Sequence, residues 1–347
     1  MKRRVVALSL ALAAMLPGCA SRWTLRTAPP GIPLQWPFQP NAAKLTFVRS
    51  LTGFTKHDGP GAAFKAFVFG GDKADSNGFV LPVAVATGRD GRIAVADMGR
   101  KCVHLFTPET SRYYRLIGSK DAKMFSPVAV VFDDDLTLYV SDSAGAVFVF
   151  GRDGELRDSW RSAGPDAFRR PTGLAYSPDR RLLYVVDTLA ATIYALDTQG
   201  KLAFTFGGRG DGEGRFNFPT HIFRSPSGDL YVTDTLNFRI VILDETGKVL
   251  GAFGRHGDGS GDMAMPKGVA VDRDGVVYVA DSLFDNVQLF DRQGRFLLTL
   301  GKRGVEAGEF WLPAGLFIDE AGQLYVCDTY NRRVQIFKVR EKYAKGS

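Results

Sequence analysis

The feature that most restricts the fold of this chain is a short segment repeated six times. Each copy has a β-rich run that ends at an aspartate, then a polar turn and a second β-rich run, as in VTDTLNFRIVIL at residues 232–243. Successive aspartates are 45, 45, 47, 47 and 47 residues apart. A fixed period of this length indicates a propeller or a linear array and argues against two unrelated domains. The repeated aspartates are Asp97, Asp142, Asp187, Asp234, Asp281 and Asp328.

Within each period the pattern predicts four strands. The fourth period has a strand after Pro219, a turn at 226–228, a second strand to Asp234, a third strand, a turn at 245–247 and a fourth strand. Four antiparallel strands per repeat make a propeller blade. Every first strand begins after a proline, which is tolerated there because no ladder hydrogen bond is lost.

The last period stops after its third strand. Residues 44–54, KLTFVRSLTGF, have the pattern of the fourth strand that is missing. If they pair with the end of the chain, the ring closes without a free edge. We therefore predict an all-β fold, a six-bladed β-propeller of four-stranded antiparallel blades over residues 44–339, in which an N-terminal strand completes the last blade. Residues 340–347 would form a polar tail.

The segments MPKGVAVDRDGVVYVADSLFDNVQLF and GEFWLPAGLFIDEAGQLYVCDTYNRRVQIF, residues 265–290 and 308–337, resemble the NHL repeat. More specifically, the chain is similar to bacterial NHL-repeat lipoproteins with a six-bladed propeller. Blades one and two depart from the pattern, because Gly99-Arg100 and Ala144-Gly145 replace the usual Thr-x-Asn turn. The fold prediction thus rests on both the period and the resemblance.

The first residues have the three regions of a secretory signal, with basic residues 2–4, an apolar run over 5–15, and LPGC at 16–19. LPGC resembles the lipobox of bacterial lipoproteins, which implies that residues 1–18 are removed and that Cys19 is acylated. An ordinary signal peptide that contains a cysteine is the alternative. Residues 19–43 are rich in proline and lack periodicity, so we expect an extended tether. Ala20 after Cys19 favours the outer membrane in lipoproteins of this kind, so we expect a cell-envelope protein whose membrane contact is the lipid alone.

Charge and cysteine content restrict the partners. The formal net charge of +7 falls to +4 without Lys2, Arg3 and Arg4, and the remaining basic residues are dispersed among acids. We therefore expect no nucleic-acid partner. Cys102 and Cys327 could form a disulfide in an oxidising envelope, or could be two buried thiols.

Two sets of residues could mark a site near the central channel. The six aspartates occupy equivalent places in every blade and can accept hydrogen bonds from turn N–H groups, so we interpret them as structural. His221, in contrast, occupies a position where the other blades have alanine or glycine. We place it near the mouth of the channel, where propellers commonly bind ligands, although it could equally bond a neighbouring blade. The channel-mouth ligand candidates are His221, Lys267, Thr172 and Thr220.

Enzymatic alternatives need metal ligands that converge. A zinc lyase on this fold would need three histidines, and the chain has His57, His104, His221 and His256 at dispersed positions. A lactonase-type calcium site would need acids at the channel mouth, where the sequence predicts none. We predict no cofactor, with zinc or calcium as the alternative, and no catalytic residue is assigned.

The turns between second and third strands, together with the links between blades, combine arginines with aromatic residues, as protein interfaces do. The aromatic residues could instead fill gaps between blades. Residues 59–80 form a long link that could cover one face. We predict a binding or scaffolding module for an envelope protein, peptide or saccharide, with a metal-dependent lyase or hydrolase, or a small-ligand sensor, as alternatives. The sequence leaves the oligomeric state open. The interaction-face candidates are Arg100, Phe238, Phe284, Tyr330, Arg332, Arg255, His256, Arg303 and Trp311.

Overall fold

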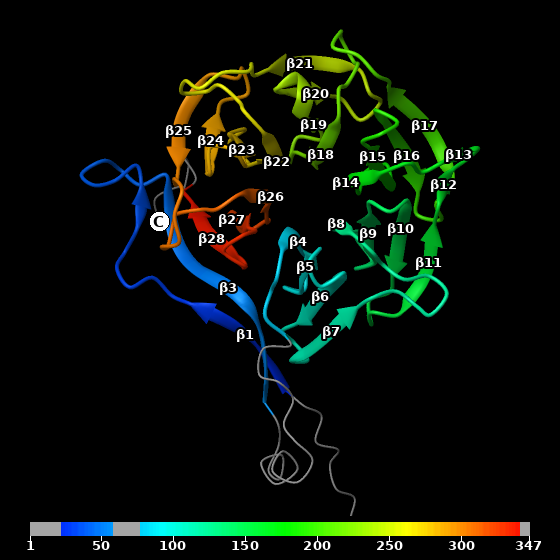
Figure 1. Cartoon of the computed structure of the whole chain (residues 1–347), viewed down its shortest axis with the longest axis horizontal. Coiled ribbons are helices and arrows are strands. Elements are labelled where there is room, and N and C mark those ends of the chain that lie inside the picture. The colour runs from blue at the N-terminus through cyan, green and yellow to red at the C-terminus, as the bar shows by residue number, and fades with distance from the viewer. Residues whose placement is uncertain (1–21, 58–76, 341–347) are drawn as a thin grey trace, which may run out of the picture.

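The computed structural model of the chain describes residues 22–57 and 77–340. These residues form six blades around a central axis, and the chain visits the blades in sequence order (Figure 1). Each blade contains four antiparallel strands, and its first strand lies nearest the axis. The predicted fold class, an all-β six-bladed propeller, is confirmed.

The strand bounds follow the repeat closely. The first strand of each blade begins at the repeated proline, and the second ends at the repeated aspartate. A two-residue hairpin, β12 (Ser162–Ala163) with β13 (Asp166–Ala167), lies in the link between the second and third blades. The blades are β4 (Pro82–Thr87), β5 (Ile93–Asp97), β6 (Cys102–Thr107) and β7 (Arg112–Leu116); β8 (Pro127–Phe132), β9 (Leu138–Asp142), β10 (Ala146–Phe150) and β11 (Leu156–Trp160); β14 (Pro171–Ser177), β15 (Leu182–Asp187), β16 (Thr192–Asp197) and β17 (Leu202–Gly207); β18 (Pro219–Arg224), β19 (Leu230–Asp234), β20 (Arg239–Leu243) and β21 (Val249–Phe253); β22 (Pro266–Val271), β23 (Val277–Asp281), β24 (Asn286–Phe290) and β25 (Phe296–Leu300); and β26 (Pro313–Ile318), β27 (Gln323–Asp328), β28 (Arg333–Val339) and β3 (Leu45–His57).

Local turn chemistry determines where the strands end. After β20, the Asp244 carboxylate accepts hydrogen bonds from the backbone N–H groups of Thr246 and Lys248, at 2.8 and 3.0 Å. Gly247 completes this turn with a φ of 90°, which glycine adopts without a steric penalty. Asp197 and Asp291 make the equivalent contacts in the third and fifth blades. The aspartate and the glycine within this segment therefore determine the turn from the third to the fourth strand.

The ring closes as the sequence predicts. β28, the third strand of the last blade, pairs with the first half of β3, from Val334 opposite Leu51 to Val339 opposite Leu45. The second half of β3 reaches the first blade, where Phe54 packs against Phe79 and Phe106. A single strand from the N-terminal region therefore joins the last blade to the first.

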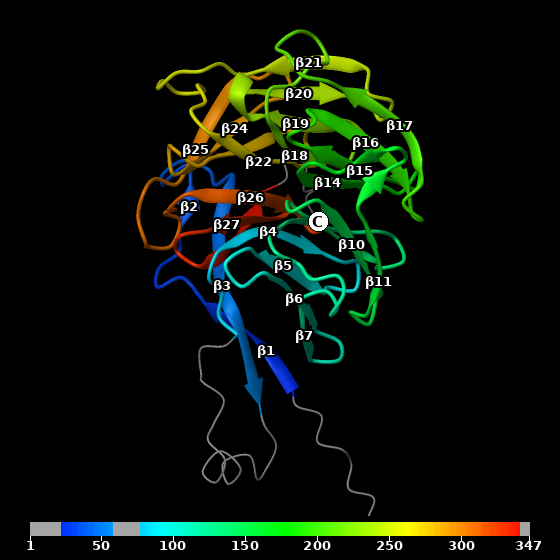
Figure 2. The ribbon, with the colours of Figure 1, turned by 45° about the vertical axis from the view of Figure 1, so that its right-hand side comes forward.

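The region expected to be an extended tether is attached to the ring. Residues 22–28 form β1 (Arg22–Ala28), which pairs with β3, and β2 (Gln35–Trp36) pairs with the beginning of β3. Trp23 contacts Tyr113 of the first blade at a ring distance of 4.6 Å, and Trp36 packs edge-on against Phe337. The indoles bury a large apolar area, which favours docking over an extended chain. Figure 2 shows β1 beside β3, projecting from the ring.

The core lies largely between neighbouring blades, and the inner strands approach one another closely. A Cβ atom added to Gly268 would lie 2.5 Å from the carbonyl oxygen of Ala314 in the next blade. An added Cβ on Gly173 or Gly315 would likewise meet backbone atoms of the next blade. Close packing of the blades thus explains the glycine at the third position of the inner strand in these three blades.

Several sequence predictions concern residues outside the described ranges. They are the signal segment 1–18, Cys19, most of the 59–80 link and the end of the polar tail. Within the described residues the sole helical element is the 3-10 turn η1 (Thr235–Asn237), and no helix there is long and apolar enough to cross a membrane.

Candidate functional site

The repeated aspartates organise one face of the ring, which we call the aspartate face. All six are buried, and each accepts hydrogen bonds from backbone N–H groups. Asp187, for example, accepts from Arg169 and Arg170 in the link before β14, and from Leu189 and Ala190 in the turn after β15. Each aspartate thus holds an inter-blade link beside the turn between the second and third strands.

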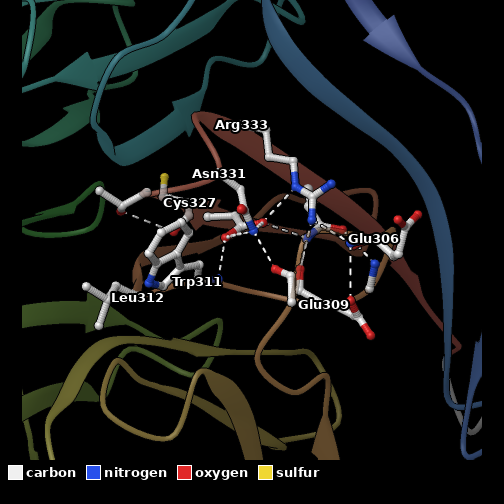
Figure 3. A network of polar contacts seen from close by, with 12 residues as sticks. Glu306, Glu309, Trp311, Leu312, Cys327, Asn331 and Arg333 are labelled. Atoms are coloured by element: carbon white, nitrogen blue, oxygen red, sulfur yellow. Dashed lines mark hydrogen bonds and ion pairs between the residues drawn. The ribbon is translucent and has the colours of Figure 1, made fainter.

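Asparagine and arginine extend this network in the last blade (Figure 3). Asn331 donates to Asp328 and to the carbonyl oxygen of Gly304, while Arg333 Nε lies 2.6 Å from Asp328 Oδ2. Arg333 also donates to the carbonyl oxygens of Glu306 and Glu309 in the preceding link. Asn237 and Arg239 make the same contacts in the fourth blade. These links are therefore held in a fixed conformation.

The hydroxyl residue after the aspartate connects neighbouring blades. Thr188, Thr235 and Ser282 each donate to the carbonyl oxygen of the proline that begins the next blade, at 2.6, 3.1 and 2.6 Å. Thr329 makes the same bond to Pro82 at 2.8 Å, across the closure of the ring. The Asp-Thr or Asp-Ser pair thus holds both the turn and the next blade in place.

Exposed apolar side chains gather on the aspartate face. Leu189, Leu236, Leu283 and Tyr330, each two residues after a repeated aspartate, are between 40 and 61% exposed, and Met98 directly follows the aspartate of the first blade. We call these five residues the apolar ring. Phe125, Met265 and Trp311, in the adjoining links, are also exposed. In the last blade a backbone bond joins the two sets, from the Tyr330 N–H to the Trp311 carbonyl oxygen at 3.2 Å.

The interaction-face candidates from the sequence form two local clusters here. Arg303 lies over the Trp311 ring at 5.8 Å, and Trp311 contacts Tyr330 at 5.5 Å. Phe238 contacts His256 at 4.4 Å. Arg255 and Arg332 are exposed as well, whereas Phe238, Phe284 and Arg100 are half-buried. Arg100 donates to the Gly78 carbonyl oxygen, so part of its role is structural.

Sequence reasoning missed most of the apolar ring. Met98, Leu189, Leu236 and Leu283 attracted no attention because single apolar residues in turns are common. The available signal was their repetition, since a leucine follows Asp-Thr or Asp-Ser in three consecutive blades. A repeated apolar residue at the tip of a tight turn has no core to enter, and it therefore marks a surface.

The channel candidates occupy the inner strands. His221 Nδ1 lies 3.0 Å from Thr220 Oγ1, and burial, followed by the charge of Lys267, lowers the His221 pKa to about 3. Burial also lowers the pKa of Lys267, with Arg170 as the next cause. Thr172 pairs with the Thr188 hydroxyl at 2.8 Å. His221 and Thr220 thus touch, while Thr172 belongs to a separate contact within the third blade.

A cavity of about 490 Å³ lies within the ring. His221, Ala84, Ala129, Gly173 and Gly315 line its narrow end. The other end is lined by exposed residues of the turns between first and second strands, on the face opposite the aspartate face. We call this cavity the funnel and this side the funnel face. His221, which we expected near a channel mouth, lies at the inner end of the funnel.

Acidic side chains occur at the funnel mouth. Asp133, Asp272 and Asp319 each accept a hydrogen bond from a tyrosine hydroxyl, at 3.1, 2.9 and 3.0 Å. Exposed Asp134 and Glu320 follow two of them. The sequence-based search for acids considered the opposite end of the inner strands and therefore missed them. The signal lay in FDDD, VDRD and IDEA, which follow three inner strands.

The remaining histidines and cysteines are dispersed. Within residues 22–57 and 77–340, no three His, Cys, Asp or Glu side chains are grouped so that they could hold a metal ion. His57 contacts Thr24 at the surface, whereas His104 is buried between Asp97 and Tyr113. Cys102 and Cys327 are buried free thiols, and burial raises the pKa of Cys102 to about 12.

Comparison with known proteins agrees with this architecture. The NHL repeat family model matches residues 310–337, which include all of β26 and β27 and most of β28. The chain resembles virginiamycin B lyase from Staphylococcus aureus with a TM-score of 0.55 and 12% identity, over 75% of this chain and 96% of that chain. It resembles an auxiliary nutrient binding protein from Bacteroides thetaiotaomicron with a TM-score of 0.59 and 14% identity, over 77% and 71%. At such identities the likeness is one of fold. No curated protein matches the sequence.

Proposed function

Because the chain is a six-bladed propeller with an NHL repeat in its last blade, we propose that it is a binding module that holds a protein partner on its aspartate face. The apolar ring is the observation that carries this proposal. Its leucines and tyrosine follow the repeated aspartates of four blades on one face, and they are exposed in the described structure. Contiguous exposed apolar side chains mark interaction sites in soluble domains.

The composition of the face favours a protein partner over a saccharide. Tyr330, Trp311 and Met265, with Arg303 and Arg332 nearby, belong to the residue types enriched in protein interfaces. Aromatic side chains and arginine are the residue types most common at hot spots, and the aromatic rings bury a large area at low cost in conformational entropy. The partner should present apolar side chains for the ring and acidic groups for the arginines.

Rigidity supports the same proposal. The turns that carry the ring are held by the buried aspartates, and the links are held by Asn331, Arg333 and their counterparts. A surface that is already in its bound conformation loses little entropy on association. The propeller would therefore act as a scaffold that presents a preformed face.

Photo-cross-linking in the native host tests the proposal. A photoreactive residue at Leu236, which is 48% exposed on the aspartate face, is compared with one at Leu250, which is 47% exposed on the outer strand β21. We expect one protein to be captured from position 236 and not from position 250. Capture from position 250 alone, or of lipid rather than protein from position 236, would contradict the proposal.

We also propose that the module is anchored in a bacterial envelope, with an outer-membrane address, through a lipid on Cys19. The support comes from the N-terminal sequence. Since β1 begins at Arg22, only Ala20 and Ser21 separate Cys19 from the folded body, and the three residue steps from Cys19 to Arg22 span at most about 11 Å. Anchoring would therefore hold the propeller close to the membrane. A Cys19→Ser variant should leave the membrane fraction, and its retention there would refute the anchor.

The alternative, a metal-dependent lyase or hydrolase, is tested by metal analysis of protein purified without chelators or metal-binding tags. Zinc or calcium at one equivalent, lost on His221→Ala, would replace the binding proposal with an enzymatic one. The proposed binding function requires no metal.

A further inference from the structure

The funnel carries a second site, independent of the apolar ring and on the opposite face. Its walls are apolar, with Val130, Leu174, Ile222 and Leu316 from four different blades. Its volume of about 490 Å³ is within the range of pockets that hold small molecules. The chemistry of its two ends, taken separately, defines what it can bind.

At the narrow end, a chain of hydrogen bonds determines which nitrogen of His221 carries the proton. The Pro266 carbonyl oxygen can only accept, so the Thr235 hydroxyl donates to it at 3.1 Å. Thr235 Oγ1 must then accept from the Thr220 hydroxyl, 2.8 Å away. Thr220 has no second hydrogen, and its oxygen therefore accepts from His221 Nδ1–H at 3.0 Å.

The neutral imidazole of His221 therefore has its hydrogen on Nδ1 and a free lone pair on Nε2. Nε2 has no hydrogen-bond partner among the described residues, and the side chain lines the funnel. The low pKa, caused by burial and Lys267, keeps the ring neutral at ordinary pH. The narrow end thus offers one hydrogen-bond acceptor, and the nearby positive charge of Lys267 makes it unfavourable for a cation.

The wide end is acidic. The lining contains three arginines and six carboxylates, a formal net charge of −3 in a chain whose own net charge is +7. Arg224 pairs with Asp179 and Glu245, which lie outside the lining, so its charge is already balanced. Burial, with a contribution from Asp274, raises the pKa of Asp272, as expected where carboxylates are crowded. A concave site of one sign attracts ligands of the other. The charged residues of the lining are Arg89, Asp133, Asp134, Arg224, Asp272, Arg273, Asp274, Asp319 and Glu320.

We infer that the funnel binds a small amphipathic amine, with its ammonium group among the carboxylates at the mouth, its apolar body against the inner strands, and a neutral O–H or N–H group donating to His221 Nε2. An anionic ligand would be repelled by the carboxylates at the mouth. A plain alkylamine would leave the acceptor at the narrow end unpaired. The two ends therefore select for a molecule with a cation at one end and a neutral donor at the other.

The test uses 6-aminohexan-1-ol as the probe, with hexylamine and 6-hydroxyhexanoate as matched compounds, and ¹⁵N-histidine NMR of the full protein as the readout. The His221 signals should show a protonated Nδ1 and an unprotonated Nε2 before any probe is added. The amino alcohol should shift the Nε2 signal and bind about 3- to 10-fold more tightly than hexylamine, as one added hydrogen bond allows. The hydroxy acid should not bind.

Variants separate the two ends of the site. His221→Phe should abolish the advantage of the amino alcohol over hexylamine, and Thr220→Val, which removes the acceptor for Nδ1–H, should reduce it. A protonated Nε2 in the unmodified protein, equal binding of the amine and the amino alcohol, or preference for the hydroxy acid would each overturn the inference. These results on the unmodified protein stand even if a variant fails to fold, and they do not depend on the aspartate face.

Discussion

At the scale of single residues, the dipeptide Asp-Thr or Asp-Ser accounts for much of the order in this ring. The aspartate accepts backbone hydrogen bonds from the link before its blade and from the turn that follows it, while the hydroxyl reaches the first proline of the next blade. Both side chains are buried, so a polar group that lost its hydrogen-bond partner here could not bond to water instead. This buried polar pair thereby specifies how neighbouring blades pack against each other.

Thr329→Val should destabilise the protein by about 1–3 kcal/mol, because the substitution leaves the carbonyl oxygen of Pro82 without its donor. Thr329→Ser keeps the hydroxyl and should cost clearly less. Urea unfolding of both variants measures the difference. Equal losses for valine and serine would show that the hydroxyl does not hold the ring closed.

Gly268→Ala should cost about 1–3 kcal/mol, because the added methyl group overlaps the backbone of the next blade. Gly251→Ala in β21 is the matched control, since an added Cβ there meets nothing within 4 Å. Its free energy of unfolding should change little. If both substitutions had the same effect, close packing of the inner strands would not explain the small residues.

The role of an individual residue can be predicted from the sequence only where its contacts are with residues nearby in the chain. The asymmetry of His221 is visible in the repeat, and so is its neighbour Thr220. The direction of its hydrogen bonds is not, because it depends on Thr235 and on the Pro266 carbonyl oxygen in the next blade. The acids of the funnel mouth were missed for a similar reason. Which end of the inner strands opens into a cavity depends on how the six blades assemble, and the sequence of one repeat does not show it.

At the scale of elements, the strands within each blade and the closing strand β3 could be predicted, whereas the N-terminal strands β1 and β2 could not. Repetition supplied six examples of one hairpin, whereas β1 and β2 occur once and lie among prolines. Their order comes from contacts distant in sequence, such as Trp23 with Tyr113 and Trp36 with Phe337. The sequence around an apolar residue in a proline-rich segment does not indicate which surface the residue packs against.

Trp36→Ala should destabilise the protein by about 3–5 kcal/mol, the usual cost of removing a buried large aromatic side chain. Trp36 is 5% exposed, whereas Trp311 is 38% exposed on the aspartate face. Trp311→Ala should therefore cost much less. Thermal unfolding of both variants makes the comparison, and an unchanged melting temperature for Trp36→Ala would restore the view of this region as a loose tether.

At the scale of the whole molecule, period and closure were predictable because they are properties of the sequence pattern as a whole. The difference between the two faces is visible only in the assembled ring. Turns that follow the second strands carry exposed leucines on one side, and turns that follow the first strands carry charges on the other. The protein thus combines a preformed apolar surface with a separate acidic funnel.

The stability of the fold should depend on pH through His221. Its folded pKa of about 3 lies below the value near 6.5 expected for the unfolded chain. Below pH 6.5 the unfolded state takes up the proton first, so stability falls as the pH is lowered from 6.5 towards 3. The contribution is up to about 1.4 kcal/mol per pH unit. A His221→Gln variant should lose less stability between pH 7 and pH 5, and equal losses would contradict this assignment.

The most direct test of the binding function is the affinity for the partner captured from position 236. Leu236→Glu combined with Leu283→Glu introduces charge on the aspartate face, and Leu250→Glu combined with Leu297→Glu does the same on the outer strands, where both leucines are comparably exposed. The first pair should weaken binding by about 30-fold or more, the loss of one interface hot spot, and the second pair should leave it unchanged. Equal affinities for the two double variants would show that the apolar ring is not the binding surface.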